Sequence, residues 1–374
     1  MKITSTTLSH KKNLKREQPY HKKAKQPGVV KKVKSKFDPD VVDLTGLIDI
    51  TEVKISPKAK QTAKIKEERT ETIKGILHAI EEAGNSKKLK KLTAKTPAHK
   101  SSGESLMMLF SDWHFGKVIK TRKGHYIYNS EIAKKRVEEE IPAQFEEFLK
   151  KKANCKAIEE LVIVFAGDIV DNDIIYETQR LNIDSGVAIQ FTTSINAIMT
   201  MTKKFRALLD KYVGKDILIR FECLTGNHGR AGKNSETPLC SWDTAVYAAL
   251  DLAVKTAGLK NITVSFSIED YNLITIRGHR GLVVHHAPPQ SESPGAKKFF
   301  GGMYEIFDYD FMLYGDLHHW AASCYNGKPL LMNGSLCGYD DYAISLAVRD
   351  DWSQYLITVT DDNVTENLTR FTRK

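Results

Sequence analysis

The residues in this sequence that could do chemistry are acidic and imidazole side chains that follow short apolar runs. Asp112 and His114 stand two positions apart, just after the apolar run at residues 106–110. A short apolar run that ends at polar residues is typical of a buried strand, so both side chains would project from the strand's end. A carboxylate oxygen and an imidazole nitrogen suit a divalent metal ion. Asp-x-His pairs are common by chance, so this pair is weak evidence until other strands end the same way.

Four further apolar runs are followed by the same kinds of residue. They are residues 161–166, followed by Asp168 and Asp171; 217–224, followed by Asn227 and His228; 281–284, followed by His285; and 311–314, followed by Asp316 and His318. Singly, each residue has a structural explanation, such as a helix cap, a turn residue or a satisfied core histidine. Independent caps would not share one strand-end context five times, and α/β sheets bind ligands at the carboxyl ends of their strands.

The elements that must position these residues alternate between strands and helices after residue 103. We expect strands at 106–110, 161–166, 217–224, 262–267, 272–277, 281–285 and 311–314, and helices at 130–151, 173–213, 241–257 and 296–306. Such alternation is typical of α/β architecture. Two hairpins should follow. The first spans residues 321–332 around Asn326-Gly327, a strong hairpin signal, and the second spans residues 356–369 around Asp361-Asp362-Asn363.

The first hundred residues have a different character. Residues 1–36 are rich in Lys and lack apolar periodicity, so we expect them to be disordered in isolation. Residues 37–103 form a predicted linker, in which a short apolar patch precedes one amphipathic helix at residues 62–83. We therefore predict a basic tail at residues 1–36, this linker, and one large domain at residues 104–374.

The positive charge of the chain is concentrated in its N-terminal part. Residues 1–100 hold 25 Lys and Arg against 11 Asp and Glu, whereas residues 101–374 hold 31 against 35. Basic arms often contact phosphate backbones, so nucleic acid is the partner that this segment favours. The alternative is a solvated tail that aids solubility. The sequence leaves a protein partner and the oligomeric state open.

Composition limits the remaining classes of protein. Hydrophobic residues make up 41% of the chain, which allows a sizeable core. No apolar stretch is long enough for a transmembrane helix, and the N-terminus lacks the apolar segment of a secretory signal, so we expect no membrane partner. The five cysteines are scattered without a CxxC pair, which indicates buried thiols in a reducing compartment. We therefore expect a cytoplasmic protein.

The order DxH, GDxxD, GNH, H and GxxH resembles the calcineurin-like metallophosphoesterase superfamily, over about residues 106–340. The resemblance implies a four-layer αββα sandwich, in which helices flank two mixed sheets and two divalent ions lie at one edge. By motif position, the first ion would be held by Asp112, His114, Asp168 and His318. Asp168 would bridge to the second ion, held also by Asn227, His285 and Asp316. His228 would act beside the phosphate, and Asp171 would orient and charge it.

This resemblance implies hydrolysis of a phosphoester. Two divalent ions about 3.5–4 Å apart clamp a phosphoryl oxygen and lower the pKa of a bridging water, and the resulting hydroxide attacks phosphorus. His228 would then stabilise the charge or protonate the leaving group. Mn²⁺ is the ion that we expect first, with Mg²⁺, Fe²⁺ and Zn²⁺ as alternatives. Nothing in the sequence suggests a Ser or Cys nucleophile.

The sequence departs from the family's pattern at three positions. Asp316 takes the place of the first histidine of the usual GHxH motif. Its hard oxygen could still bind the second ion, which would favour Mn²⁺ or Mg²⁺ there, or the substitution could weaken that ion's binding and abolish activity. Arg230 follows the GNH motif and would grip a substrate phosphate bidentately, unless it is an ordinary surface residue. His285 is followed by His286, and the family pattern favours the first as ligand.

The motif details narrow the substrate class. Residues 112–116, DWHFG, look like the DxHLG form of Mre11/SbcD-like nucleases and related phosphodiesterases. Protein Ser/Thr phosphatases of the superfamily carry Arg where this chain has Asn172, so they are disfavoured. Residues 333–343 look similar to metallophosphoesterases that bacteriophages encode, in which case the compartment would be a host cytoplasm. We expect a nuclease or phosphodiesterase. The alternatives are a phosphomonoesterase on nucleotides or small molecules, and a catalytically silent scaffold that binds nucleic acid or a partner.

Overall fold

The computed structural model describes residues 57–84, 103–177, 179–214, 216–232, 238–288, 293–348, 350–365 and 367–373. The chain divides into residues 1–54 and residues 55–374, and every element below belongs to the second unit. The predicted basic tail and the apolar patch of the linker lie outside the described residues. The predicted domain boundary near residue 103 stays a prediction.

Six strands form the first sheet, in the order β13-β12-β1-β4-β5-β6. Their bounds are β1 Glu104–Phe110, β4 Ile158–Ala166, β5 Leu218–Leu224, β6 Ile262–Phe266, β12 Ser353–Val359 and β13 Asn367–Thr372. The strands β1, β4, β5 and β6 run parallel, whereas β12 and β13 form an antiparallel hairpin beside β1. Nearly all side chains of β1 and β4 are buried, because both faces of these central strands are covered, and this explains their continuous apolar sequences.

Five strands form the second sheet, in the order β10-β11-β9-β8-β7. Their bounds are β7 Tyr271–Ile276, β8 His279–Val284, β9 Phe311–Tyr314, β10 Ala321–Tyr325 and β11 Lys328–Met332. The strands β8, β9 and β11 are parallel, and β7 and β10 pair antiparallel at the two edges. The β10–β11 turn holds Asn326 at φ 48° and Gly327 at φ 76°, the left-handed pair that a two-residue hairpin favours. This predicted hairpin is confirmed. The short hairpin of β2 (Ile119–Lys120) and β3 (Tyr126–Tyr128) was not predicted.

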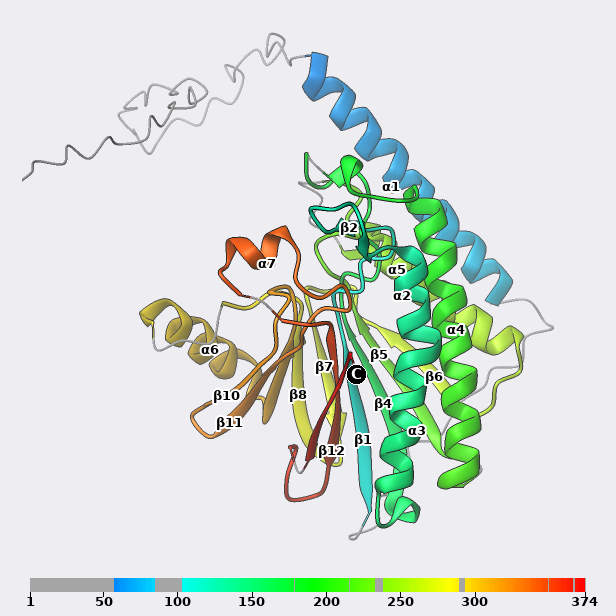
Figure 1. The fold of residues 1–374 in the computed structure, drawn as a ribbon, viewed down its shortest axis with the longest axis vertical. Coiled ribbons are helices and arrows are strands. Elements are labelled where there is room, and N and C mark those ends of the chain that lie inside the picture. Colours follow the sequence, from blue (N-terminus) through cyan, green and yellow to red (C-terminus); the bar gives the residue numbers. More distant parts are fainter. Residues whose placement is uncertain are drawn as a thin grey trace, which may run out of the picture. The chain divides into compact units, whose positions relative to one another are not determined.

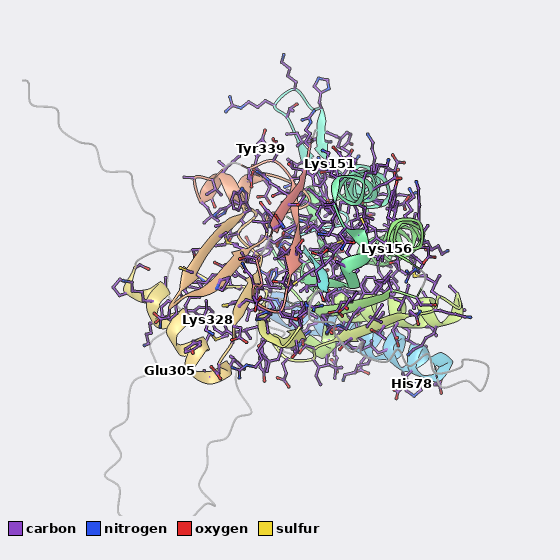
Figure 2. All side chains as sticks on the ribbon, turned by 90° about the horizontal axis from the view of Figure 1, so that it is seen from below. His78, Lys151, Lys156, Glu305, Lys328 and Tyr339 are labelled. Atoms are coloured by element: carbon purple, nitrogen blue, oxygen red, sulfur yellow. The ribbon has the colours of Figure 1, made fainter. Side chains whose placement is uncertain are left out.

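Helices cover the outer faces of both sheets (Figure 1). Their bounds are α1 Pro57–Gly84, α2 Ser130–Lys135, α3 Ile141–Lys151, α4 Val187–Tyr212, α5 Trp242–Thr256, α6 Pro294–Phe307 and α7 Asp341–Ser345, with a π-helical turn, η3 Arg136–Glu140, between α2 and α3. Short 3₁₀ turns lie at η4 Cys155–Ala157, η5 Gln179–Leu181 and η6 Pro238–Cys240. In Figure 2, which looks along the strands, Glu305 marks the α6 side and Lys151 the side of the helices that cover the larger sheet.

The apolar core has three layers, as a sandwich of two sheets between helices requires. Phe110, Phe165 and Phe205 belong to the layer between the larger sheet and its helices. Met107 and Leu313 belong to the layer between the two sheets. A third layer packs the smaller sheet against α6. The predicted αββα arrangement is therefore confirmed.

Helices are predicted over residues 173–213, but the only α-helix among the described residues of this range is α4, from Val187 to Tyr212. Between β4 and α4 the chain is irregular apart from the short turn η5. The Gln179 side chain explains why, because its amide oxygen accepts the backbone N–H groups of Ile175 and Tyr176, and its nitrogen donates to the Asp171 carbonyl. These bonds satisfy backbone groups that a helix would otherwise pair.

The helix predicted at residues 62–83 forms within α1 and packs against α5 and η6. Ile73 is fully buried in the largest core cluster, and Ile76 and Leu77 pack partly buried beside it. The apolar side of this helix is therefore part of the core that covers the six-stranded sheet.

Two expectations from the composition concern membrane-spanning helices and the state of the cysteines. None of the helices that the structure describes has the length and apolar composition to cross a membrane. All five cysteines are unpaired thiols: Cys223, Cys240 and Cys337 are buried, Cys155 is half-buried and Cys324 is exposed. The expectation of buried thiols therefore holds for three of them, and the reducing compartment stays a prediction.

Candidate metal centre

All seven predicted metal ligands lie at the carboxyl ends of parallel strands from the two sheets. They are Asp112 after β1, Asp168 after β4, Asn227 after β5, His285 after β8, Asp316 and His318 after β9, with His114 two residues beyond Asp112. Six of the seven are buried, and Asn227 is half-buried. The two sheets thus deliver their polar strand ends to one place.

The backbone at these strand ends adopts an unusual conformation. Asp112, His114, Asp168, Asp316 and His318 all have positive φ angles, between 47° and 69°. The left-handed region is unfavourable for residues with a Cβ, and such conformations gather at functional sites, where the surrounding structure compensates for the strain. This strained backbone occurs after β1, β4 and β9, whereas Asn227 and His285, which follow β5 and β8, are not among the residues with positive φ.

Two glycines of the motifs allow the ligands to approach closely. A Cβ on Gly226 would lie 2.0 Å from Asp168 Oδ1, and a Cβ on Gly315 would lie 2.5 Å from Asp112 Oδ2. Both distances are shorter than any real contact, so larger residues at either position would displace the carboxylate. The glycine of the GNH motif and that of the GxxH motif are thus explained by the space that the acidic ligands occupy.

The first group of possible ligands is Asp112, His114 and His318. The Nε2 atoms of the two histidines lie 3.0 Å apart. Asp112 Oδ1 lies 3.7 Å from His318 Nε2 and 3.9 Å from His114 Nε2. Ligand atoms bound at about 2.0–2.2 Å to one ion lie roughly 3–4 Å from one another, so this spacing fits a single divalent cation.

The second group is Asp112, Asp168 and His285. His285 Nε2 lies 3.3 Å from Asp168 Oδ2, and 3.2 Å from Asn227 Oδ1. The same Asp168 Oδ2 lies 3.8 Å from His114 Nε2, which belongs to the first group. Asp168 therefore lies between the two groups, where a carboxylate that bridges two cations would have to be.

His228 and Asp171 lie against the same carboxylate, on the side of the GNH loop. His228 Nε2 is 3.9 Å from Asp168 Oδ2, and its Nδ1 is 3.1 Å from Asp171 Oδ1. Asp171 Oδ1 is also 3.1 Å from His114 Nδ1, so one carboxylate oxygen orients two imidazoles. Burial alone would lower the pKa of His228, but Asp168 and Asp171 raise it above its usual range, which favours a protonated ring.

The electrostatics of the pocket suit positive ions. Burial, followed by Lys117 and His228, lowers the pKa of His114 to about 3, so this imidazole is neutral and can donate a lone pair to a metal. Burial opposes ionisation of Asp168, yet the neighbouring His285 and His228 hold the pKa of that carboxyl well below its usual range. A buried carboxylate needs a nearby positive charge. For His285 and His318, burial lowers the pKa but neighbouring carboxylates raise it well above the usual value, so the site has a negative character that fits divalent cations.

Asp316, which replaces a histidine of the family's pattern, points into the second group. Its Oδ1 lies 3.6 Å from His285 Nε2, and its Oδ2 lies 2.6 Å from His286 Nδ1. The two adjacent histidines thus differ: His285 is buried within the pocket, whereas the His286 side chain is 69% exposed and contacts Asp316 from outside. Asp316 thus holds one carboxylate oxygen within the spacing that ligands of one ion would have from His285.

Arg230 lies two residues after the GNH motif. Its Nε donates a hydrogen bond to the Asn227 carbonyl at 2.6 Å, and the side chain is half-buried. The residue is therefore tied to the GNH loop that carries Asn227 and His228.

Asp243 joins two of the motif loops and was not predicted from the sequence. The buried Asp243 carboxylate, in the first turn of α5, accepts hydrogen bonds from the backbone N–H groups of Asp168, Ile169 and Gly226, at 3.0, 3.2 and 2.9 Å. A further bond comes from the next residue after Ile169. Burial, followed by Asp168, raises the pKa of Asp243 to about 6, so the group is ionised at neutral pH. In the sequence, an Asp after Ser at a helix start is indistinguishable from an ordinary cap.

A second missed residue, Asp340, holds one of the histidines. Asp340 Oδ1 lies 3.2 Å from His318 Nδ1, and its other oxygen accepts a hydrogen bond from Lys117. A carboxylate behind a metal-binding imidazole fixes the ring's orientation and makes the far nitrogen a better ligand. Asp340 lies in the stretch 333–343, which the resemblance singled out without giving it a role.

A third missed group connects α1 to the motif loops. Arg69 donates from Nη1 to Asn172 Oδ1 at 2.9 Å, and its Nη2 pairs with Asp173 at 2.7 Å. The Asn172 amide in turn donates to the carbonyls of His228 and Arg230, both at 2.8 Å. Asn172 thus links the GDxxD and GNH loops, and Arg69 ties this link to the N-terminal helix. No local pattern in the sequence connects residues so far apart.

The sequence matches no protein-family model and no curated protein. Solved structures with a similar arrangement include Vps29 from Entamoeba histolytica in complex with zinc. It shares 9% identity over 71% of this chain and 96% of that chain, with a TM-score of 0.30. A novel archaeal phosphodiesterase shares 9% identity over 72% of this chain and 99% of that chain, with a TM-score of 0.34. A predicted phosphoesterase from Streptococcus pneumoniae shares 10% identity over 72% of this chain and 99% of that chain, with a TM-score of 0.28. Similarity this low carries no statement about activity, which has to come from the residues of the site.

Proposed function

We propose that this protein is a hydrolase of phosphoesters that depends on two divalent metal ions, and that within this class it is a phosphodiesterase or nuclease. The observation that carries the proposal is the position of Asp168 between two groups of potential ligands, with the His228 imidazole beside it. Asp112, His114, Asp168 and His318 would hold one ion. Asp168, Asn227, His285 and Asp316 would hold the other.

The protein's own residues have separable tasks in this proposal. When bound, two divalent ions supply a Lewis acid for the phosphoryl oxygens and lower the pKa of water enough for attack at neutral pH. His228 holds a proton that it can give to the leaving oxygen from Nε2, because Asp171 occupies its Nδ1 side. Arg230, on the GNH loop, would pair with a phosphate oxygen of the substrate.

The identity of the ions is also part of the proposal. The replacement of a histidine by Asp316 raises the share of hard oxygen ligands in the second group, and hard oxygen favours Mn²⁺ or Mg²⁺ over Zn²⁺. We therefore propose Mn²⁺ as the activating ion. The DWHFG form of the first motif supports a function similar to that of Mre11/SbcD-like nucleases, more than to that of protein phosphatases.

Hydrolysis of model esters tests the proposed function. We expect the protein with Mn²⁺ to hydrolyse bis(p-nitrophenyl) phosphate and EDTA to abolish the reaction. A His228→Ala variant should lose about 10²–10⁴-fold in kcat, the usual contribution of a general acid. The exposed His125→Ala variant is the matched control and should keep wild-type activity. Metal-independent hydrolysis, or none of any phosphoester, would contradict the proposal, and hydrolysis of p-nitrophenyl phosphate alone would indicate a monoesterase.

The proposal includes a nucleic-acid contact for the basic N-terminal region, which lies mostly outside the described residues. Lysines that neutralise phosphates release counterions, so binding should weaken steeply with salt. The suitable truncation removes residues 1–54, because α1 is packed against α5 and contributes Ile73 to the core. We expect this truncated protein to bind a 30-mer DNA more weakly, with a shallower slope of log affinity against log salt. An unchanged slope would remove the arm from the proposal.

A further inference from the structure

Five rings contact one another in succession at the candidate metal centre, from Tyr176 through three histidines to Tyr342. Neighbouring ring centroids are 5.0 Å apart for Tyr176 and His228, 4.5 Å for His228 and His114, 4.9 Å for His114 and His318, and 5.5 Å for His318 and Tyr342. His114, in the middle, is fully buried, whereas each tyrosine is 40% exposed. The ends of this succession of rings are therefore accessible, and its middle belongs to the pocket.

The two tyrosines come from separate elements that are fixed by residues of the pocket. Tyr176 lies in the loop between β4 and η5, and its hydroxyl accepts a hydrogen bond from Asn227 Nδ2 at 2.9 Å. Tyr342 lies in α7, two residues after Asp340, whose carboxylate contacts His318. Each ring is therefore held in register with a histidine of the site.

The placement of these rings is selective. The exposed aromatic side chains among the described residues are Tyr126, Tyr176, Trp320 and Tyr342, and two of these four contact a histidine of the pocket. Half-exposed aromatic rings are the surfaces on which unpaired bases stack in proteins that bind single strands.

We propose that Tyr176 and Tyr342 bind unpaired nucleobases of the strand whose phosphate enters the site, which makes single-stranded nucleic acid the substrate class of this site. The inference rests on the proposed phosphodiesterase function. A phosphodiester in a nucleic acid carries a nucleoside on each of two ester oxygens, and the site offers two exposed aromatic rings, each in contact with one of its histidines. Bases in a duplex stack on each other and are not available to these rings, so the site should prefer single strands.

Binding measured without metal tests this inference independently of catalysis. The probe is a fluorescently labelled (dT)12 strand, with its duplex as the comparison, titrated with full-length protein in EDTA. We expect tighter binding of the single strand, and a loss of about tenfold in affinity for Tyr176→Ala and for Tyr342→Ala, as is usual for one stacked base. Tyr126→Ala removes an exposed tyrosine outside this succession of rings and is the matched control, with unchanged affinity expected.

Steady-state kinetics with Mn²⁺ separates stacking from a role in holding the histidines. Tyr342→Ala should raise KM for bis(p-nitrophenyl) phosphate and leave kcat near the wild-type value, because stacking binds substrate and transition state alike. Loss of kcat with unchanged KM would assign the tyrosines to the support of the histidines and overturn the inference, as would unchanged (dT)12 affinity in both variants. If the wild-type protein hydrolyses no ester but the variants lose (dT)12 binding, the proposed function fails while the base-binding surface stands.

Discussion

Replacing Asp168 with Asn should abolish both metal uptake and hydrolysis. Asp168 Oδ2 faces His114 Nε2 at 3.8 Å and His285 Nε2 at 3.3 Å, so one carboxylate serves both groups of ligands. An Asn keeps the shape and can still accept the His228 backbone N–H, but it removes the negative charge that two cations would share. We expect wild-type protein to retain about two Mn²⁺ per chain and the variant to retain fewer than one. The value of kcat should fall about 10³-fold or more, since a metal ion contributes several kcal/mol to such reactions.

Metal content by elemental analysis after gel filtration measures the first effect, and hydrolysis of bis(p-nitrophenyl) phosphate measures the second. The matched control is Asp210→Asn, on α4, where the carboxylate contacts only Arg206 among the described contacts and is partly exposed. That variant should keep its metal and its activity. An Asp168→Asn protein that retains two ions, or that keeps wild-type kcat, would contradict a bridging role for this carboxylate.

Replacing Asp243 with Asn should destabilise the protein and disable the site together. The carboxylate accepts backbone N–H groups from both the GDxxD loop and the GNH loop, so it fixes the relative positions of Asp168 and Asn227. An Asn offers a single oxygen, and its NH₂ group would face backbone N–H donors in a buried place. The loss of charge-assisted bonds and the buried unsatisfied donors cost about 3 kcal/mol, which lowers the melting temperature by about 5–10 °C in a protein of this size.

Thermal unfolding followed by circular dichroism, with and without Mn²⁺, measures this effect. Asp251→Asn is the matched control, because this aspartate lies on the same helix and contacts Lys255 at a partly exposed position. We expect its melting temperature to stay within about 1 °C of the wild type, as is usual for surface substitutions. If Asp243→Asn melts like the control and hydrolyses substrate normally, the two loops do not depend on this carboxylate.

Local patterns were sufficient to find the elements that carry the site. Apolar runs of strand length predicted the strands that end at Asp112, Asp168, His285 and Asp316, because burial on both faces of a central strand leaves a continuous apolar sequence. The Asn326-Gly327 turn was predictable for the same local reason. No α-helix begins at residue 173, because the Gln179 side chain hydrogen-bonds to backbone groups nearby. Apolar periodicity carries no information about such bonds.

The sequence by itself therefore determined which residues gather at the strand ends, because hydrophobic periodicity and polar breaks are properties of neighbouring residues. Only the tertiary structure shows which other side chains position these motif residues. Asp243 contacts the motif loops from α5. Asp340, just before α7, contacts His318. Arg69 contacts Asn172 from α1. Each of these contacts joins segments whose order in the chain says nothing about their distance in space. A buried carboxylate finds its donors only when the sheets have packed, so no pattern of neighbouring residues could have specified them.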